Sequence, residues 1–296
     1  MDALSHALIA SILFSAPGLT PLIPFAVLGA VIPDADIVFP KISETNPSLY
    51  LFTHGGIAHS IAGVFALTLL AYGMVVLLAA AGIIPASSIA AAGVYGFGAV
   101  LAGALLHLAL DVSACPGIPV FAPFSDRKYT LGILPGPSLL LAVAALGLVM
   151  VVTLPLLPFS SAIVIYGSVV ILYIAVRAAM FLVAAVKLPG RKVPSINPFR
   201  WLVIQEDETS YKVRTYTLFF GYSGEAEFEK FRNTDAGELA VAAQLPKVRR
   251  FFFYSYIVTA ERTGSVLILT DPLREKGYLY YPQLHKRVEV DPGYAG

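Results

Sequence analysis

Two histidines, His54 and His59, lie five residues apart and just before a long apolar run that begins at Ile61. An imidazole is costly to place in hydrocarbon unless it has a partner. A histidine pair at the start of an apolar helix therefore indicates a site of specific chemistry. Imidazole nitrogen is a ligand that Zn²⁺ and other transition metals accept. The pair predicts a metal site if other parts of the chain bring further ligands to the same place.

Three other segments carry side chains of the same kind. His107 and Asp111 are four residues apart in a second apolar run, so they project from one face of a helix. Two aspartates follow Pro33, where a chain that leaves a helix can present both carboxylates. An early histidine begins the chain's first apolar run. The predicted metal ligands are His6, Asp34, Asp36, His54, His59, His107 and Asp111.

This ligand set defines the chemistry that we expect. Three to five histidine and carboxylate ligands suit Zn²⁺ best here, with Mn²⁺ and Fe²⁺ as alternatives. The single cysteine, Cys115, excludes a cysteine-based zinc site. More than four ligands could hold either one or two ions, and a pair of ions clamps both oxygens of a hydrolytic displacement. Asp36 and Asp111 are the predicted catalytic residues, because a spare carboxylate can act as a general base.

Each of these signals has a simpler explanation when it is taken alone. Ser5 and His6 could cap a helix. Asp34 and Asp36 could form a turn after Pro33. His107 and Asp111 could be a hydrogen-bonded pair that satisfies itself at a helix end, and His54 and His59 could be two interfacial imidazoles. Taken together these explanations are weaker, since a single membrane topology places all the predicted ligands at the same face of the membrane.

The composition defines the class of protein. Of 296 residues, 57% are hydrophobic and only 13% are charged, whereas soluble domains carry about 25% charged residues. We therefore expect an integral membrane protein. The net charge of +1 gives no electrostatic reason to expect a nucleic-acid partner. A cleavable signal peptide is not expected, because no basic segment precedes the first apolar run.

The apolar runs predict a polytopic α-helical bundle. Two short runs, 3–16 and 21–32, predict an N-terminal helical hairpin that is either re-entrant or spanning, since a spanning helix needs about 20 residues. Four long runs predict transmembrane helices. They cover residues 61–84, 89–110, 137–157 and 162–186.

The charge distribution divides the chain in two. Residues 1–186 hold only four of the 20 lysines and arginines. We therefore predict a transmembrane metal-site domain over 1–187 and a small soluble α+β domain over 188–296. The second domain is expected to gate the site or to bind a protein partner. Its expected strands are 201–205, 211–220, 254–260 and 266–269, and its expected helix is 236–245.

The basic residues predict the orientation. Lys187, Arg191 and Lys192 follow the last apolar run directly, which favours the cytoplasmic side. Counting backwards, the connections 115–136 and 33–53 are cytoplasmic as well. All seven predicted ligands then lie at the cytoplasmic face of the plasma membrane, together with the C-terminal domain.

Three cations are the predicted substrate-binding residues. Arg127 and Lys128 could form a cationic rim for an anionic lipid head group, or they could serve only as an orientation signal. Arg177, deep in the last apolar run, could pair with a carboxylate or a substrate phosphate, or it could extend toward the membrane surface. His285, the fifth histidine, lies in a charged segment and is expected at the surface.

The order of these motifs resembles that of a known family. Residues 32–36 read Ile-Pro-Asp-Ala-Asp, residues 54–60 read His-Gly-Gly-Ile-Ala-His-Ser, and residues 106–111 read Leu-His-Leu-Ala-Leu-Asp. Over roughly residues 1–187 the chain resembles the membrane-bound metal-dependent hydrolases of the bacterial inner-membrane YdjM type. The resemblance implies a hydrolase that uses the same seven residues. One difference is Gly55, where members often have arginine.

Our leading hypothesis is a membrane-embedded hydrolase of an ester or phosphoester, acting on a lipid or lipid-linked substrate. The first alternative is a divalent-metal transporter. Its site would be expected near the bilayer midplane, however, whereas the candidate ligands collect at one end of the helices. The second alternative is a scaffold in which the metal is structural and the C-terminal domain binds a partner.

Overall fold

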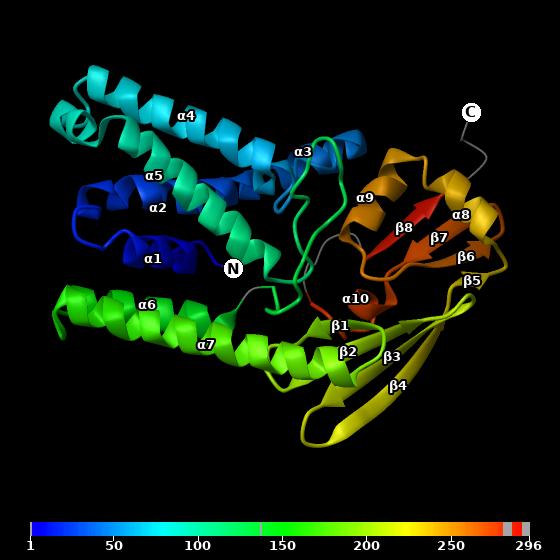
Figure 1. Cartoon of the computed structure of the whole chain (residues 1–296). Coiled ribbons are helices and arrows are strands. Elements are labelled where there is room, and N and C mark those ends of the chain that lie inside the picture. The colour runs from blue at the N-terminus through cyan, green and yellow to red at the C-terminus, as the bar shows by residue number, and fades with distance from the viewer. Residues whose placement is uncertain (1, 137, 281–285, 292–296) are drawn as a thin grey trace. The chain divides into compact units, whose positions relative to one another are not determined.

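The computed structural model describes residues 2–136, 138–280 and 286–291, so His285 lies outside the described residues. The chain divides into two compact units (Figure 1). Unit 1 contains Met1–Pro40 and Leu51–Ala179, and unit 2 contains Lys41–Tyr50 and Met180–Gly296. The boundary that we placed after residue 187 stays a prediction. No pattern in the sequence indicated that the connection 41–50 would join the C-terminal unit.

Unit 1 is helical, as its apolar runs predict. Its longer helices lie along one another (Figure 1). Short 3-10 helices carry the chain between them, namely η1 (Thr20–Leu22), η2 (Ile32–Val38) and η4 (Ile57–His59). The α-helices are α1 (Ala3–Leu13), α2 (Ile23–Val31), α4 (Ile61–Ala80), α5 (Ala86–Val112), α6 (Leu139–Thr153) and α7 (Phe159–Lys187), the last of which ends in unit 2.

Four described helical segments are long and apolar enough to cross a membrane, which confirms the polytopic bundle. They are Thr20–Thr45, Ile61–Ala80, Ala92–Val112 and Phe159–Lys187. These four segments are not the same as the four long runs that we predicted to be transmembrane helices. The run 137–157 forms only the 15-residue α6, because Pro155 follows its end and cannot continue a helix. The run 21–32 instead continues through η2, since proline is tolerated in a helix's first turn.

Helices α2 and α5 are in close contact, and two glycines make this possible. A Cβ atom on Gly29 would lie 1.9 Å from the carbonyl oxygen of Val100, and one on Gly103 would lie 2.0 Å from that of Ala26. Glycine allows helix backbones to approach in this way in membranes. The approach places the end of α2, with η2 directly after it, beside the end of α5.

We expect Gly103→Ala to destabilise the protein, because the new methyl group collides with the α2 backbone. The matched control is Gly98→Ala in the same helix, where a Cβ atom meets nothing within 4 Å. Alanine is favoured over glycine in a helix by about 1 kcal/mol, so the control should be neutral or stabilising. Thermal unfolding in detergent measures both variants. Equal midpoints for the two would contradict the close approach.

Unit 2 contains two four-stranded sheets with strand orders β1-β2-β3-β4 and β5-β6-β7-β8. The first is antiparallel throughout, and in the second only β5 and β6 pair in parallel. The strands are β1 (Arg191–Pro194), β2 (Arg200–Glu206), β3 (Ser210–Thr217), β4 (Gly221–Glu229), β5 (Phe231–Arg232), β6 (Thr259–Thr263), β7 (Val266–Thr270) and β8 (Arg287–Val290).

The helices of unit 2 correct one expectation. Residues 254–260 were expected as a strand, but α9 (Pro246–Tyr254) extends into this range and β6 begins only at Thr259. Helix α8 (Ala236–Ala242) lies within the expected range and is capped by Asp235, which accepts a hydrogen bond from the Glu238 amide. Two shorter helices, α3 (Pro40–Thr45) and η3 (Pro47–Leu49), fall largely in the 41–50 connection, and α10 (Pro272–Glu275) follows β7.

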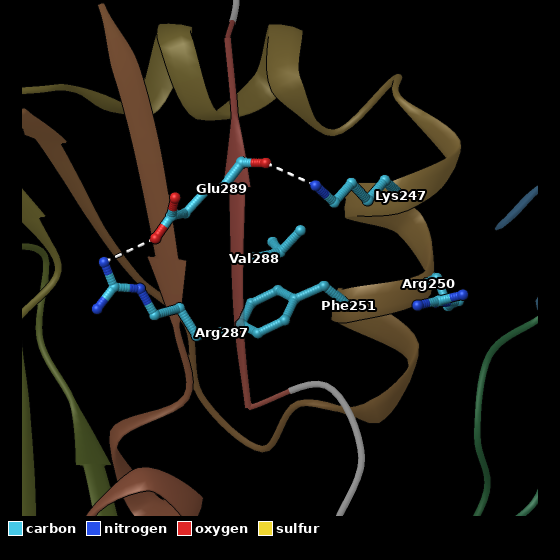
Figure 2. A pocket seen from close by; sticks show the side chains of 6 residues that line it. All are labelled: Lys247, Arg250, Phe251, Arg287, Val288 and Glu289. Carbon is cyan, nitrogen blue, oxygen red and sulfur yellow. Dashed lines mark hydrogen bonds and ion pairs between the residues drawn. The ribbon is translucent and has the colours of Figure 1, made fainter. Parts of the chain in front are cut away.

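A pocket of unit 2 lies between α9 and β8 (Figure 2). Its cations already have partners, as the dashed lines in the figure show in part. Arg287 pairs with Glu289 at 2.9 Å, and the Lys247 ammonium donates to the Glu289 carbonyl at 2.9 Å. Arg250 donates to the carbonyl of Ser43.

Candidate metal centre

The predicted ligands lie on four separate segments of unit 1. His6 lies in the first turns of α1, whose N-cap is Asp2, so the alternative that Ser5 and His6 cap this helix does not hold. The aspartate pair lies in η2, and His59 ends η4 just before Ser60 caps α4. The last pair is on α5. The structure brings all seven predicted residues into one connected cluster.

The centre of the cluster is a ring of four ligand atoms in which nitrogen and oxygen alternate. The Nε2 atom of His59 lies 3.4 Å from Asp34 Oδ1 and 3.5 Å from Asp111 Oδ2. The Nε2 atom of His107 lies 3.6 Å from Asp34 Oδ1 and 3.3 Å from Asp111 Oδ2. Asp34 and Asp111 thus each face both histidines. His6 is adjacent, with Nε2 3.4 Å from Asp111 Oδ1 and its ring stacked on His107.

These separations fit a shared cation better than they fit hydrogen bonds. A hydrogen bond between nitrogen and oxygen spans about 2.7–3.2 Å, so all four sides of the ring are too long. Two ligand atoms that each lie about 2.1 Å from one ion are about 3.0–3.4 Å apart, which is close to the length of the four sides. Among the described residues, the buried Nε2 atoms of His6 and His107 have no hydrogen-bond partner. Nitrogen and oxygen donors of this kind fit Zn²⁺, Mn²⁺ or Fe²⁺.

Hydrogen bonds on the far side of each ring fix the histidines. The Nδ1 atom of His107 lies 2.7 Å from the carbonyl oxygen of Ala30, an acceptor, so this nitrogen donates and Nε2 keeps its lone pair. The Nδ1 atom of His59 lies 3.1 Å from Asp36 Oδ2. A histidine whose other nitrogen donates to a carboxylate or carbonyl is the usual arrangement around a protein-bound metal.

Asp36 differs from the other two carboxylates. Its side chain is fully buried, and its oxygens face His54 Nδ1 at 2.7 Å, His59 Nδ1 at 3.1 Å and the Gly55 amide at 3.2 Å. These are hydrogen-bond distances. Asp34 and Asp36 therefore lie on opposite sides of the His59 imidazole, with Asp34 facing its Nε2 atom and Asp36 its Nδ1 atom. Two positions apart in a 3-10 helix of three residues per turn, they point in different directions.

The charges of the cluster favour a cation. Three carboxylates lie among side chains that are mostly buried, and buried charge is costly unless it is compensated. Burial alone would lower the pKa of His59, but the neighbouring carboxylates of Asp34 and Asp36 outweigh it and raise this pKa to about 9. The ion-free site thus keeps a proton where a metal ligand is needed. A cation that binds at Nε2 displaces this proton.

We expect Asp36→Asn to weaken metal binding by about 10- to 100-fold, because residues that orient a metal-bound histidine have this effect. The amide keeps the shape of the side chain but removes the charge that holds His59 Nδ1. Titration with Zn²⁺ in detergent, followed by calorimetry, measures the change. His54→Ala is the matched control and should cost less, since its 34% exposed side chain pairs with Asp36 and faces none of the four atoms of the central ring by its nitrogen contact. An unchanged affinity in Asp36→Asn would contradict the orienting role.

The central ring is mostly buried, and its exposed surface belongs to the two carboxylates. The side chains of His6, His59 and His107 are 0–1% exposed. Those of Asp34 and Asp111 are 14% and 12% exposed. Solvent thus reaches the ring of ligand atoms at its two carboxylates.

The predicted substrate-binding cations make other contacts. The guanidinium of Arg127 lies 5.5 Å from the centre of the Tyr129 ring. Arg177 is buried, and its Nε donates to the carbonyl of Ile133 at 3.3 Å. Lys128 is half-buried in the same connection as Arg127. Their role toward a substrate stays a prediction.

Two backbone groups of the site could not be found from side-chain types. One is the Ala30 carbonyl, which holds His107. The other is the Gly55 amide, which donates to Asp36 from a backbone with φ of 73°. Glycine adopts this left-handed conformation without strain, which gives a physical reason for glycine at this position.

Three groups of described residues could each hold a metal ion. They are His6 with His107 and Asp111, Asp34 with His59 and His107, and Asp36 with His54 and His59. Neither the curated proteins nor the solved structures contain a match to the chain. The sequence model of the YdjM inner membrane protein family matches residues 1–187, which is more than half of the chain. The chain therefore belongs to the YdjM inner membrane protein family.

Proposed function

We propose that this protein is a membrane-embedded hydrolase with one divalent metal ion, Zn²⁺ as the best match, held by His59, His107, Asp34 and Asp111. The observation that carries the proposal is the ring of alternating nitrogen and oxygen atoms with sides of 3.3–3.6 Å. One ion suffices for this ring. The Asp36 contacts have hydrogen-bond lengths, which argues against a second ion beside His54.

A bound Zn²⁺ would supply a Lewis acid and lower the pKa of a water molecule to near neutrality. The chain's own groups prepare the site for this. The Ala30 carbonyl and Asp36 hold the two histidine rings, and the buried imidazoles exclude bulk water from the inner side. Asp111 is the group that we assign to accept a proton. Its Oδ2 belongs to the ring, while its Oδ1 faces His6 at 3.4 Å.

Asp36 was the other predicted catalytic carboxylate, and we now assign it to positioning. Its side chain has no exposed surface, and both of its oxygens already face hydrogen-bond donors. A substrate or water molecule reaches Asp34 and Asp111 more easily, since both keep some exposure. The assignment of Asp36 as a metal ligand changes for the same reason.

The substrate that we propose is an ester or phosphoester of a lipid or lipid-linked molecule. His59 lies just before α4, and His107 and Asp111 lie near the end of α5; both helices are long enough to cross a membrane, and head groups lie at such helix ends. We place the site and the C-terminal domain on the cytoplasmic side, supported by the basic residues after the last span.

One observation favours a second candidate. Four protein ligands also form a closed structural zinc site, whereas a catalytic zinc site keeps one position open. In that case the protein would be a metal-stabilised scaffold. The partial exposure of the two carboxylates favours catalysis, because a carboxylate at the surface can yield a position to water or substrate.

The test is to purify the protein in lipid nanodiscs, measure its metal content, and assay it against a panel of phospholipids and phosphomonoester and carboxylester lipids. We expect about one equivalent of metal and metal-dependent release of product. Flux of Zn²⁺ into proteoliposomes without hydrolysis would support the transporter alternative. One tightly held ion with neither flux nor hydrolysis would support the scaffold.

A further inference from the structure

The first sheet of unit 2 has an unusual end. Its β1–β2 and β3–β4 connections lie side by side, since the Leu218 amide donates to the Phe199 carbonyl at 2.9 Å and the rings of Phe199 and Phe219 are 5.3 Å apart. Three apolar side chains there are strongly exposed. Ile196 is 68% exposed, Phe219 70% and Phe220 87%. We call Ile196, Phe199, Phe219 and Phe220 the aromatic tip.

The aromatic tip also contains no charged side chain, and the exposed Arg200, which pairs with Thr217 across β2 and β3, adjoins it. Residues 195–199 and 215–224 contain no charged side chain, although the rest of this domain is rich in them. The first charged pair along the β3–β4 hairpin is Arg214 with Glu225, paired at 2.8 Å and several residues away from the turn. Strand residues rise about 3.3 Å each, so roughly 10 Å of the hairpin is uncharged. A water-exposed turn seldom combines two phenylalanines with such a stretch.

The last turns of α7 show where this tip lies. Within unit 2, Met180, Ala184 and Leu188 form one core cluster with Trp201, Val203, Tyr216 and Leu218. Trp201 and Tyr216 pair across β2 and β3, directly beside the tip. The tip therefore lies back along α7, beside its last two turns, rather than beyond its end.

The length of α7 places those turns at the membrane surface. The helix has 29 residues, or about 43 Å, whereas the hydrocarbon core is about 30 Å thick and takes about 20 of them. The excess belongs to the Lys187 end, because Met180, Ala184 and Leu188 pack against an open sheet, and open sheet edges do not occur in the hydrocarbon region. Residues 180–184 then cross the head-group layer, and the aromatic tip lies at the same depth.

We propose that the aromatic tip inserts into the interfacial layer of the same membrane that α7 crosses. The apolar side chains of Phe219, Phe220 and Ile196 enter the head-group and upper acyl region, as the apolar faces of interfacial segments do. The carboxylates of β4 begin only at Glu225, beyond this layer. The membrane thus holds the first sheet of unit 2 at a second point besides α7.

The test places a fluorescent probe at the tip of the full-length protein. Cys115 is the chain's single cysteine, so a Cys115→Ser background with Phe220→Cys carries one label, and Ile196→Cys gives a second, independent position. The protein is placed in nanodiscs that contain phosphatidylcholine with a spin label near the head group. The matched control is Glu208→Cys in the β2–β3 turn at the opposite end of the sheet.

We expect the spin-labelled lipid to lower the emission of the probes at 220 and 196 by about two-fold, and iodide in the buffer to leave them largely unaffected. The probe at 208 should show the reverse. Equal lipid quenching at 220 and 208 would overturn the proposal. Protection of the tip probes from iodide without quenching by lipid would also overturn it, and would show that a second protein chain covers the tip.

Discussion

Replacing His59 and His107 together by alanine should remove the metal and, with it, the hydrolytic activity. These two residues supply both nitrogen atoms of the central ring, and their Nε2 atoms lie 3.3–3.6 Å from the two carboxylate oxygens. Removing a residue that only orients a metal ligand lowers the metal affinity by about 10- to 100-fold. Removing two direct ligands should therefore lower the metal affinity by more than about 100-fold. The double variant should retain well under one equivalent of metal.

The measurement is the metal content of the purified variant by mass spectrometry, together with its thermal midpoint with and without added Zn²⁺. Ligand at about 100 times its dissociation constant stabilises a protein by about 2.7 kcal/mol, so only the unchanged protein should gain stability from the metal. Thr68→Val is the matched control. Among the described residues its buried hydroxyl has no hydrogen-bond partner, so its removal should preserve both fold and metal. A folded double variant with a full equivalent of metal would exclude the site.

Asp111→Asn should abolish turnover while metal remains bound. The asparagine keeps one carbonyl oxygen for the ring but lacks the charge and basicity needed to accept a proton. Loss of a positioned general base typically costs about 10² to 10⁴ in rate. We therefore expect kcat to fall by this range even at saturating metal.

A comparison with Asp34→Asn distinguishes a carboxylate that only binds the metal from one that also accepts a proton. Both residues face the same two histidines, and both are slightly exposed. Only Asp111 also faces His6, through its second oxygen. Excess Zn²⁺ should restore most of the activity of Asp34→Asn, since its defect is in binding. If excess metal restored Asp111→Asn equally well, Asp111 would be a metal ligand only, and the proton-accepting role that we propose for it would be wrong.

The sequence alone indicated the residues that the structure brings into one cluster and the class of protein that holds them. Long apolar runs can satisfy their backbone hydrogen bonds within a membrane only as helices, so composition was enough for the polytopic bundle. The histidines and aspartates were conspicuous because imidazole and carboxylate are costly among apolar residues. The spacing of His107 and Asp111 was enough to place both side chains on one helix face.

The individual roles were decided only by the tertiary structure. Asp34 and Asp36 are equivalent in the sequence, yet Asp34 faces Nε2 of both central histidines and Asp36 lies behind His59. This difference arises because η2 is a 3-10 helix with three residues per turn, so side chains two positions apart point in different directions. It also arises because Gly29 and Gly103 allow α2 to pack closely against α5. The Ala30 carbonyl has no side-chain signature at all. Spacing along the chain gives the direction of a side chain within one element, whereas coordination depends on distances between elements, which only their packing sets.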